Sequence, residues 1–298
     1  MVYEDKIYII GSTGNIGQPL VRKLLSNSKV SLTLYVRTPA KVQQLFGEHP
    51  DGKISIVQGD YYDQKPFVET IAGHTRLFIL LQLPDFNDYK RIGRDFAEKA
   101  YAAGVKQVVL NAGSSSSLPW RYPFYSSVPV EEAILSITDR KAFVTLRPAL
   151  FMSNQLAPGD AADTVKSINS IVGIRDPDEK TPWVSPNDIG ELAANVLQEP
   201  IEKHGDAVYE IISDPKTPKE QADILSRVLG KDINYVQITE EQFYETLTKQ
   251  AGIPHGVAFL LLQLNKYIAN KTIGLSVLLG RQPETLEGWI KQNKKFFL

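Results

Sequence analysis

The chain has 298 residues, of which 43% are hydrophobic and 22% charged, and its 33 basic and 34 acidic residues leave a formal net charge of -1. This is the composition of a globular protein that can bury a sizeable core. The balanced charge argues against a nucleic acid as the main partner, because no strong cationic field is available. The absence of cysteine excludes disulfides and thiolate sites, and the four scattered histidines indicate no metal site.

No apolar segment reaches the roughly 18 residues that a membrane-spanning helix needs. The N-terminal apolar run is short and follows acidic residues, so it is typical of a first strand rather than of a signal peptide. We therefore expect a cytoplasmic protein with no membrane partner.

In the first half of the chain, short apolar runs alternate with helix-like stretches. Strands are expected at 6–10, 31–36, 54–58, 76–81, 107–112 and 142–147. Helices are expected at 16–27, 39–46, 65–72, 87–103 and 129–137. Nearly continuous apolar strands separated by helices predict a parallel sheet that is covered on both faces. The fold class is therefore α/β, a doubly wound Rossmann sheet.

Beyond residue 150 the alternation loosens and prolines mark turns between short elements. Helices are expected near 159–170, 186–198, 218–229, 240–251, 255–268 and 283–295, and strands at 207–212 and 233–238. No linker or repeat separates the two halves. We expect a nucleotide-binding domain over 1–150 and a smaller α/β substrate lobe over 151–298 that is partly interleaved with the sheet.

The first expected strand, residues 6–10, is followed directly by the sequence GSTGNIG. Gly11 permits a tight turn, Gly14 permits close approach of the backbone to a pyrophosphate, and Gly17 permits close packing of the following helix. The alternative is a glycine-rich turn without a ligand, but the strand-to-helix setting favours dinucleotide binding. The expected cofactor-binding loop comprises Gly11, Ser12, Thr13, Gly14, Asn15, Ile16 and Gly17.

The residue after the second expected strand is Arg37, where an NAD-binding chain would carry a carboxylate for the ribose 2′-hydroxyl. An arginine suits a 2′-phosphate, so the predicted cofactor is NADP(H), with Thr38 and Lys41 assisting. The alternative is a solvated arginine at a strand end.

Three further positions complete the expected cofactor site. Asp60, with Tyr61 beside it, follows the third strand and could accept from the adenine amino group; a structural capping role for Asp60 is an equal alternative. Leu81 ends the fourth expected strand and Gln82 follows it, and both are expected to run beneath the ribose and nicotinamide.

Together these segments resemble the NmrA-like branch of the atypical short-chain dehydrogenase/reductases. The resemblance is carried by GSTGNIG, YVRTPAKVQQL, QGDYYD, AYAAGVKQVVLNAGS, VTLRPALFMSN and WVSPNDIGELAANVL, and it spans nearly the whole chain. The arginine and the following PAK are most similar to NADPH-dependent quinone and triphenylmethane-dye reductases. The resemblance implies a Rossmann domain with a small substrate lobe, and relatives that are either reductases or redox-sensing regulators.

One departure concerns the tyrosine–lysine pair of orthodox short-chain reductases. Tyr122 and Tyr125 are followed four residues later by Ser126 and Pro129, and no lysine occurs between residues 107 and 140. Quinones and cationic dyes accept hydride without that relay. The predicted function is therefore an NADPH-dependent reductase of a small aromatic or quinone-like acceptor. The alternative is an NADP(H)-sensing protein without turnover, with a regulatory protein partner; a homodimer is also possible.

The loop after the fifth strand supplies the catalytic candidates, because in the resembling family it borders the nicotinamide. Ser114 is nearest the strand end, and Tyr122 and Tyr125 are candidate proton donors; for the serine, a flexible polar turn is the plainer alternative. The substrate candidates are aromatic or polarizable side chains, which would suit a flat acceptor or simply pack the lobe interface: Trp120, Phe151, Met152 and Trp183. Asn154 is expected to be a cap or turn residue.

Overall fold

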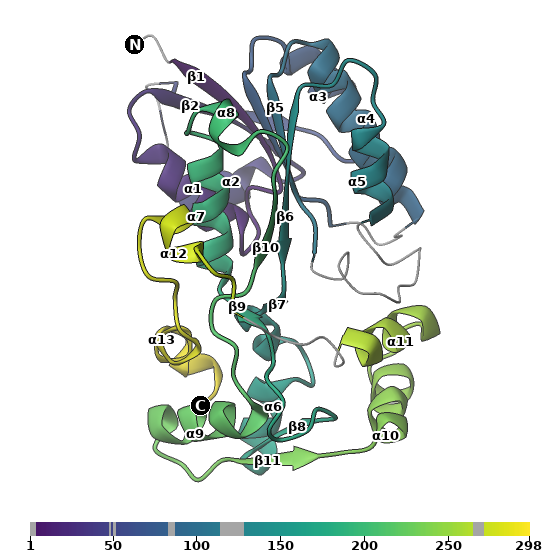
Figure 1. Ribbon diagram of the computed structural model, residues 1–298, viewed down its shortest axis with the longest axis vertical. Coiled ribbons are helices and arrows are strands. Elements are labelled where there is room, and N and C mark those ends of the chain that lie inside the picture. The colour runs from purple at the N-terminus through teal and green to yellow at the C-terminus, as the bar shows by residue number, and fades with distance from the viewer. Residues whose placement is uncertain (1–3, 48, 50–51, 83–86, 114–127, 265–270) are drawn as a thin grey trace. The chain divides into compact units, whose positions relative to one another are not determined.

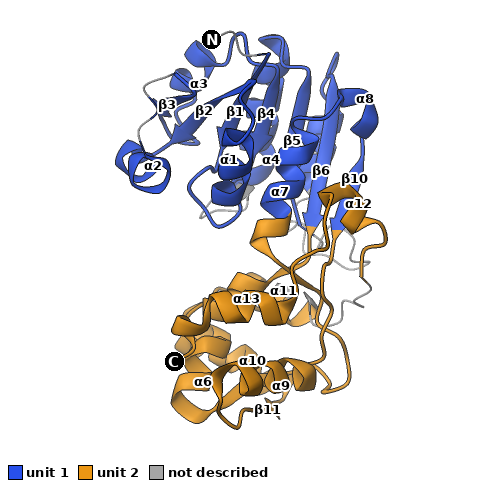
Figure 2. Ribbon diagram, turned by 90° about the vertical axis from the view of Figure 1, so that its left-hand side faces the viewer, with its two compact units in different colours: residues 1–116, 126–147, 189–210 blue, residues 117–125, 148–188, 211–298 orange. Residues whose placement is uncertain are grey.

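The computed structural model describes residues 4–47, 49, 52–82, 87–113, 128–264 and 271–298 (Figure 1). The chain divides into two compact units, coloured separately in Figure 2. Unit 1 comprises residues 1–116, 126–147 and 189–210, and unit 2 comprises residues 117–125, 148–188 and 211–298. Residues 189–210 therefore pack with the first unit although segments of the second precede and follow them.

Unit 1 is built on a seven-stranded sheet of order β10-β6-β5-β4-β1-β2-β3. Its strands are β1 Asp5–Ile10, β2 Val30–Val36, β3 Ile54–Gln58, β4 Arg76–Ile79, β5 Gln107–Asn111, β6 Ala142–Pro148 and β10 Val208–Ile211. Neighbouring strands run parallel; Ile10, for example, lies opposite Tyr35 of β2 and Ile79 of β4. The prediction of a doubly wound Rossmann sheet is confirmed.

The helices of unit 1 cover both faces of this sheet. They are α1 Gly17–Leu25, α2 Pro39–Phe46, α3 Lys65–Thr70, α4 Asn87–Ala102, α5 Val128–Leu135, α7 Pro186–Val196 (in unit 1 from Ile189 on) and α8 Ile201–His204. Figure 1 shows α1, α2 and α7 on one face and α3, α4 and α5 on the other. Coverage on both faces explains why the last four residues of β1 are all apolar or aromatic and fully buried.

Aromatic rings join β1 and β2 to the helices that pack on them. Phe67 of α3 packs edge-on against Tyr8 at 5.1 Å and against Phe96 of α4 at 4.8 Å between ring centroids. Tyr35 of β2 lies 6.1 Å from the Phe67 ring, also edge-on. Such pairs add roughly 0.5–1.5 kcal/mol each to the apolar burial, so they stabilise the strands that flank the glycine-rich loop.

Unit 2 has its own apolar core around Met152, Trp183, Leu225 and Trp289. It contains two parallel pairs of strands, β8 with β11 and β7 with β9. Its strands are β7 Leu150–Phe151, β8 Ser170–Gly173, β9 Trp183–Val184 and β11 Asn234–Gln237. Its helices are the 3₁₀ turn Met152–Leu156, α6 Ala161–Ile168, α9 Pro218–Leu229, α10 Glu240–Glu245, the π-helical stretch Thr246–Gln250, α11 His255–Leu264, α12 Leu275–Leu279, α13 Leu286–Gln292 and the 3₁₀ turn Lys294–Phe296.

The strand β8 was not expected, because residues 159–170 had the pattern of one helix. Asn169 adopts a left-handed conformation with φ 48° and ends α6. The chain therefore turns at Asn169, and Ser170 begins a strand that pairs with β11. The helix expected over 255–268 is observed as far as Leu264, and its last residues lie outside the described part of the chain.

Candidate functional site

The segments expected to bind the cofactor meet at one edge of the unit 1 sheet. In a parallel sheet all carboxyl ends lie at the same edge, and here β1 stands between β2 and β4. The glycine-rich loop follows β1, Arg37 follows β2, Asp60 lies beyond β3, and Gln82 lies beyond β4. The chain leaves β1 toward β2 on one side and returns as β4 on the other, and this switch point is where doubly wound sheets bind ligands.

Two of the three glycines are required by packing inside the chain. Gly11 has φ +92°, and a Cβ there would lie 2.7 Å from the Leu80 carbonyl oxygen. A Cβ at Gly17 would lie 2.1 Å from the Gly11 carbonyl oxygen. Both positions exclude side chains, because the loop folds tightly on itself and on the end of β4.

Gly14 has no such internal reason to be glycine. A Cβ there would have the Gly11 carbonyl oxygen as its nearest neighbour, at an ordinary contact distance of 3.8 Å, and the φ of Gly14 lies outside the left-handed region. The residue is exposed. A glycine that the fold does not demand is consistent with a ligand whose close approach demands it.

The start of α1 adds two features that fit an anion. The helix has no side-chain cap at Ile16 and no acidic residue in its first turn, so its N-terminal dipole is not offset there by local negative charge. The Ser12 hydroxyl is completely buried and has no hydrogen-bond partner among the described residues. A buried hydroxyl without a partner is costly, and a phosphate oxygen would supply one. The residues of this loop therefore fit a dinucleotide.

Arg37, Thr38 and Lys41 lie on the solvent side of the strand end, and all three are exposed. The Arg37 carbonyl oxygen accepts a hydrogen bond from Gln58 Nε2 at 3.4 Å. The Arg37 charge also contributes, as the smallest of several causes, to a lowered pKa of the Asp60 carboxyl. The exposed guanidinium beside the loop is compatible with the predicted 2′-phosphate contact, which stays a prediction.

Asp60 holds a turn after β3, and it is not the helix cap that the sequence analysis gave as its structural alternative. Its Oδ1 accepts from the backbone N–H groups of Asp63 at 2.8 Å and Tyr62 at 2.7 Å, and these bonds are the main cause of its lowered pKa. It does not cap α3, whose N-cap is Gln64. Its contact with an adenine amino group stays a prediction, since the carboxylate is exposed.

The turn that carries Asp60 is fixed to β2 by one tyrosine. The Tyr35 hydroxyl donates toward the carbonyl oxygens of Asp60 at 2.8 Å and Asp63 at 3.0 Å. A Cβ at Gly59 would lie 2.3 Å from that hydroxyl oxygen, so glycine is required there. Burial raises the pKa of the Tyr35 hydroxyl, which therefore stays protonated as the donor.

The remaining expected cofactor residues are Leu81 and Gln82, just after β4, and Tyr61, just after β3. Gln82 is exposed, whereas Leu81 is 6% exposed and packs in the unit 1 core. Tyr61 hydrogen-bonds the backbone of Gln82, while burial raises the pKa of its hydroxyl. Tyr61 thus joins the ends of β3 and β4, and Leu81 contributes mainly to the core.

Asn111 is a residue of this edge to which the sequence analysis assigned no role. It ends β5, which lies beside β4, and its buried Oδ1 has no hydrogen-bond partner in the part of the chain that the structure describes. Its Nδ2 donates to the Ala112 carbonyl oxygen at 3.4 Å. The available signal was a polar residue ending the otherwise apolar strand sequence QVVLN.

The predicted catalytic residues Ser114, Tyr122 and Tyr125 lie outside the described residues, as does the predicted substrate contact Trp120. Their assignments stay predictions.

The other substrate candidates belong to unit 2 and are not equivalent. Met152 is fully buried in the core of the unit, and Phe151 is half-buried in β7. Trp183 lines a cavity of ≈ 210 Å³. Asn154 also lines this cavity and belongs to the turn Met152–Leu156, where its carbonyl oxygen accepts from Ala157 N at 2.9 Å.

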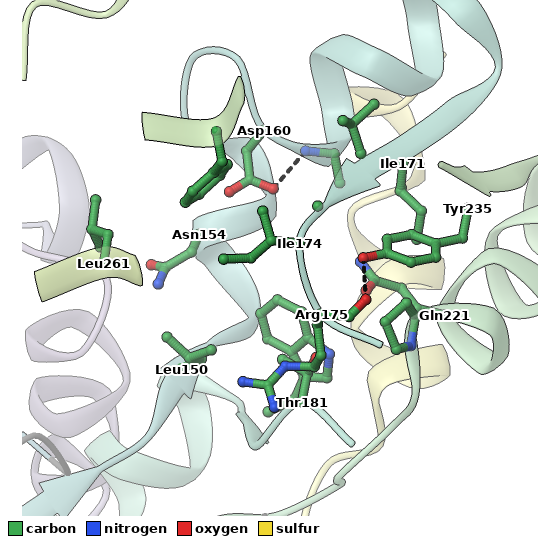
Figure 3. A pocket seen from close by; sticks show the side chains of 16 residues that line it. Leu150, Asn154, Asp160, Ile171, Ile174, Arg175, Thr181, Gln221, Tyr235 and Leu261 are labelled. Atoms are coloured by element: carbon green, nitrogen blue, oxygen red, sulfur yellow. Dashed lines mark hydrogen bonds between the residues drawn. The ribbon is translucent and has the colours of Figure 1, made fainter. Parts of the chain in front are cut away.

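The described residues that line the cavity all belong to unit 2, and Figure 3 shows it from close by. The strands β7, β8 and β9 form part of its wall and contribute Leu150, Ile171 and Trp183. The rest of the wall comes from the start of α6, where Asp160 is the N-cap, and from α9, α10 and α11, which contribute Gln221, Phe243 and Leu261. Arg175 and Tyr235 also face it, and the Tyr235 hydroxyl donates to the Arg175 carbonyl oxygen at 2.6 Å. Sequence reasoning missed Arg175 because β8 and the turn after it were not expected. It expected the strand that holds Tyr235 but not its pairing with β8.

In the described residues, no cluster of three or more histidine and carboxylate side chains is arranged to hold a metal ion. No helix within those same residues is long and apolar enough to cross a membrane.

Comparison with known sequences supports the resemblance found in the motifs. Residues 3–291 match the NmrA-like family. The chain is similar to agroclavine dehydrogenase from Claviceps fusiformis, with 27% identity over 209 residues that cover 68% of this chain and 70% of that protein. It is also similar to festuclavine synthase II from Penicillium roqueforti, with 31% identity over 179 residues that cover 59% of this chain and 58% of that protein.

Solved structures share the fold over almost the whole chain. A triphenylmethane reductase from Citrobacter sp., solved with NADP(H), has a TM-score of 0.77 and 26% identity, covering 96% of this chain and 99% of that one. The NADPH-dependent quinone oxidoreductase QOR2 from Escherichia coli has a TM-score of 0.77 and 24% identity, covering 97% and 99%. The negative transcriptional regulator NmrA, solved with NAD, has a TM-score of 0.73 at 16% identity, covering 97% and 94%.

Proposed function

The chain belongs to the NmrA-like family, and from this premise we propose that it is an NADPH-dependent reductase that transfers hydride to a small aromatic or quinone-like acceptor. Relatives named as dehydrogenases or oxidoreductases support the reaction class. The regulator NmrA has the same fold, so the family resemblance alone does not decide between turnover and sensing.

The observation that carries cofactor binding is the contrast within the glycine-rich loop. Gly11 and Gly17 are required by the fold, whereas Gly14 is exposed and sterically free to carry a side chain. The buried Ser12 hydroxyl supports the same conclusion, since it has no partner in the described chain. In the proposal, the loop backbone and Ser12 bind the pyrophosphate at the start of α1.

Arg37 selects the phosphorylated cofactor in this proposal. A guanidinium can donate two parallel hydrogen bonds to a phosphate, and no acidic side chain follows β2 directly to receive a ribose 2′-hydroxyl. Lys41, one turn into α2, adds positive charge on the same side. Asp60 and Gln82 border the adenine and nicotinamide ends of the site.

Bound NADPH would supply the hydride, and the protein's own contribution is to bind and orient. The chain has no tyrosine–lysine relay between residues 107 and 140. An acceptor that becomes stable on receiving hydride needs no strong acid from the protein, because water can deliver the proton. This favours quinone-like or cationic aromatic acceptors over simple ketones.

The test is an NADPH titration of the purified chain followed by NADPH oxidation with menadione, a benzoquinone and a triphenylmethane dye as acceptors. The proposal expects saturable binding and acceptor-dependent loss of NADPH absorbance. A simple aromatic ketone serves as the control acceptor and should react much more slowly. Saturable binding without oxidation of any acceptor would replace the reductase by the NADP(H)-sensing alternative, which the retained loop and the missing relay also allow.

A further inference from the structure

The cavity of unit 2 combines features that a packing void does not need. At ≈ 210 Å³ it exceeds the roughly 150 Å³ of an apolar cavity that accommodates benzene. Its wall contains aromatic rings from Trp183, Tyr235 and Phe243 as well as aliphatic side chains. These dimensions and walls suit one or two fused aromatic rings.

A buried positive charge lies in the same wall. Arg175 is 6% exposed, and desolvation by burial lowers the pKa of its guanidinium. One amino group donates to the Lys180 carbonyl oxygen at 3.1 Å and lies 4.0 Å from a carboxylate oxygen of Glu179. The Glu179 side chain is 63% exposed, so this pair is weak. A ligand anion inside the cavity would interact with the guanidinium where water screens it least.

A buried hydrogen-bond donor on a residue of the wall supports the same ligand independently. Trp183 is 7% exposed and lines the cavity, and its indole N–H has no hydrogen-bond partner among the described residues. Buried indole N–H groups usually have an acceptor. The backbone N–H of Trp183 donates to the Thr181 carbonyl oxygen at 3.0 Å. Figure 3 shows Thr181 near the Arg175 guanidinium.

The two ends of the cavity carry side chains of opposite charge. In Figure 3 the Arg175 side chain extends toward Leu150, while Asp160 lies on the other side of Ile174. The Asp160 carboxylate caps α6 by accepting from Ala161 N at 2.6 Å. An anionic group would be repelled at that end, so a bound acid would have one orientation, with its anionic group at Arg175 and a hydrogen-bond donor or bare ring edge toward Asp160.

We propose that the cavity of unit 2 binds a small planar aromatic acid, with its carboxylate at Arg175 and Trp183 Nε1 and its rings between the apolar walls. The inference concerns unit 2 alone and does not require that the chain bind a dinucleotide.

The test compares two isosteric ligands, naphthoate and its neutral amide, by titration calorimetry on the full chain. Naphthoate should bind about 10- to 100-fold more tightly than naphthamide, as expected for a hydrogen-bonded charge. In Arg175→Met this preference should disappear. The matched control is Arg227→Met, since Arg227 is an exposed arginine of the same unit that pairs with Glu287 at 2.9 Å; its preference should be unchanged.

A second variant keeps the proposal testable if Arg175→Met does not fold. Trp183→Phe retains an aromatic ring but lacks the N–H, and it should weaken naphthoate binding severalfold. Equal affinities for the acid and the amide in the wild-type chain would overturn the proposal. So would a preference that survives Arg175→Met.

NADPH binding, measured on the same samples, separates this inference from the proposed function. Loss of naphthoate preference with NADPH affinity intact is expected for Arg175→Met. Naphthoate added to the menadione assay then shows how the cavity relates to the acceptor site. Competition with menadione would identify the cavity as part of the acceptor site, and unchanged turnover would identify it as a separate binding site. A wild-type chain that binds NADPH but neither naphthalene compound overturns the cavity proposal and leaves the reductase proposal standing.

Discussion

Gly17 packs its α-carbon against the carbonyl oxygen of Gly11, so closely that a Cβ at position 17 would lie 2.1 Å from that oxygen. Gly14, midway between them, has no comparable neighbour. One motif therefore contains two glycines that the fold requires and one that it does not. Substitutions at these positions should separate stability from ligand binding.

Gly14→Ala should leave the free energy of unfolding within about 1 kcal/mol of the wild type, because alanine fits there without strain. NADPH affinity should fall at least about tenfold, since the methyl group would stand where the pyrophosphate approaches the backbone. Chemical denaturation and NADPH titration measure the two effects. Gly17→Ala is the matched control and should lose about 1–3 kcal/mol of stability through overpacking. Unchanged NADPH affinity in Gly14→Ala would remove the main support for the cofactor site.

Ser12→Ala should have opposite effects on the free and the bound protein. Removing a buried hydroxyl without a partner should leave the free chain as stable as the wild type or up to about 1–3 kcal/mol more stable. NADPH affinity should fall by roughly 3- to 10-fold through loss of one hydrogen bond. Thermal unfolding with and without NADPH reports both effects. Ser136→Ala, which removes an exposed hydroxyl bonded to the Ala133 carbonyl oxygen, should leave NADPH affinity unchanged.

Arg37→Ala should reduce NADPH affinity about 10- to 100-fold, the range for a charged hydrogen-bonded contact, and should change NADH affinity little. Paired titrations with the two cofactors measure the ratio. Arg91→Ala is a suitable control, since Arg91 is an exposed arginine of unit 1 that pairs with Asp88 at 2.9 Å. Equal losses for NADPH and NADH would mean that Arg37 does not contact the 2′-phosphate.

Asp188 predicts a pH-dependent contribution to stability. It is fully buried, accepts from Glu284 N at 2.9 Å and pairs with Arg281 at 2.9 Å, yet burial raises its pKa to about 6. Because the folded-state pKa exceeds the unfolded value of 3.8, its stabilising contribution is present below about pH 4 and is lost as the pH rises through 6. The difference in unfolding free energy, wild type minus Asp188→Asn, should fall by on the order of 2–3 kcal/mol across that window.

Asp206 provides a control of opposite sign for the Asp188 experiment. Its pKa is lowered, chiefly by the hydrogen bond from Arg140. The stability that Asp206 contributes is therefore present above its unfolded pKa and lost as the pH falls through its folded pKa. The difference in unfolding free energy, wild type minus Asp206→Asn, should therefore grow as the pH rises through that range, and denaturation curves measure it. For Asp188, a difference in unfolding free energy between the wild type and Asp188→Asn that does not change between pH 4 and 6 would contradict the role assigned to burial.

The sheet of unit 1 was predictable because its signal is local and repeated. The strands β1 to β5 are mostly apolar runs such as KIYII, and each of these five is followed by a helix. The NmrA-like family was identified from the same motifs, and the match over residues 3–291 confirms it. The glycine-rich loop could be predicted as a nucleotide site because its glycines fall where a strand gives way to a helix.

Unit 2 was less predictable because its short elements depend on contacts distant in sequence. The strand β8 exists through pairing with β11, more than 60 residues later, and it follows a left-handed asparagine that the pattern did not reveal. Arg175 therefore received no role in the sequence analysis, although it is buried beside a cavity. Asn111 was missed for a related reason, because a missing hydrogen-bond partner is a property of the folded chain and not of its sequence.

The central claim is that the chain reduces an acceptor with NADPH, and mixing the preformed protein–NADPH complex with menadione tests it most directly. We predict loss of the NADPH absorbance within the dead time or first seconds after mixing, with a rate that saturates in menadione and is strongly reduced in Gly14→Ala. A complex that forms but retains its NADPH absorbance with every acceptor of the panel would contradict the reductase account.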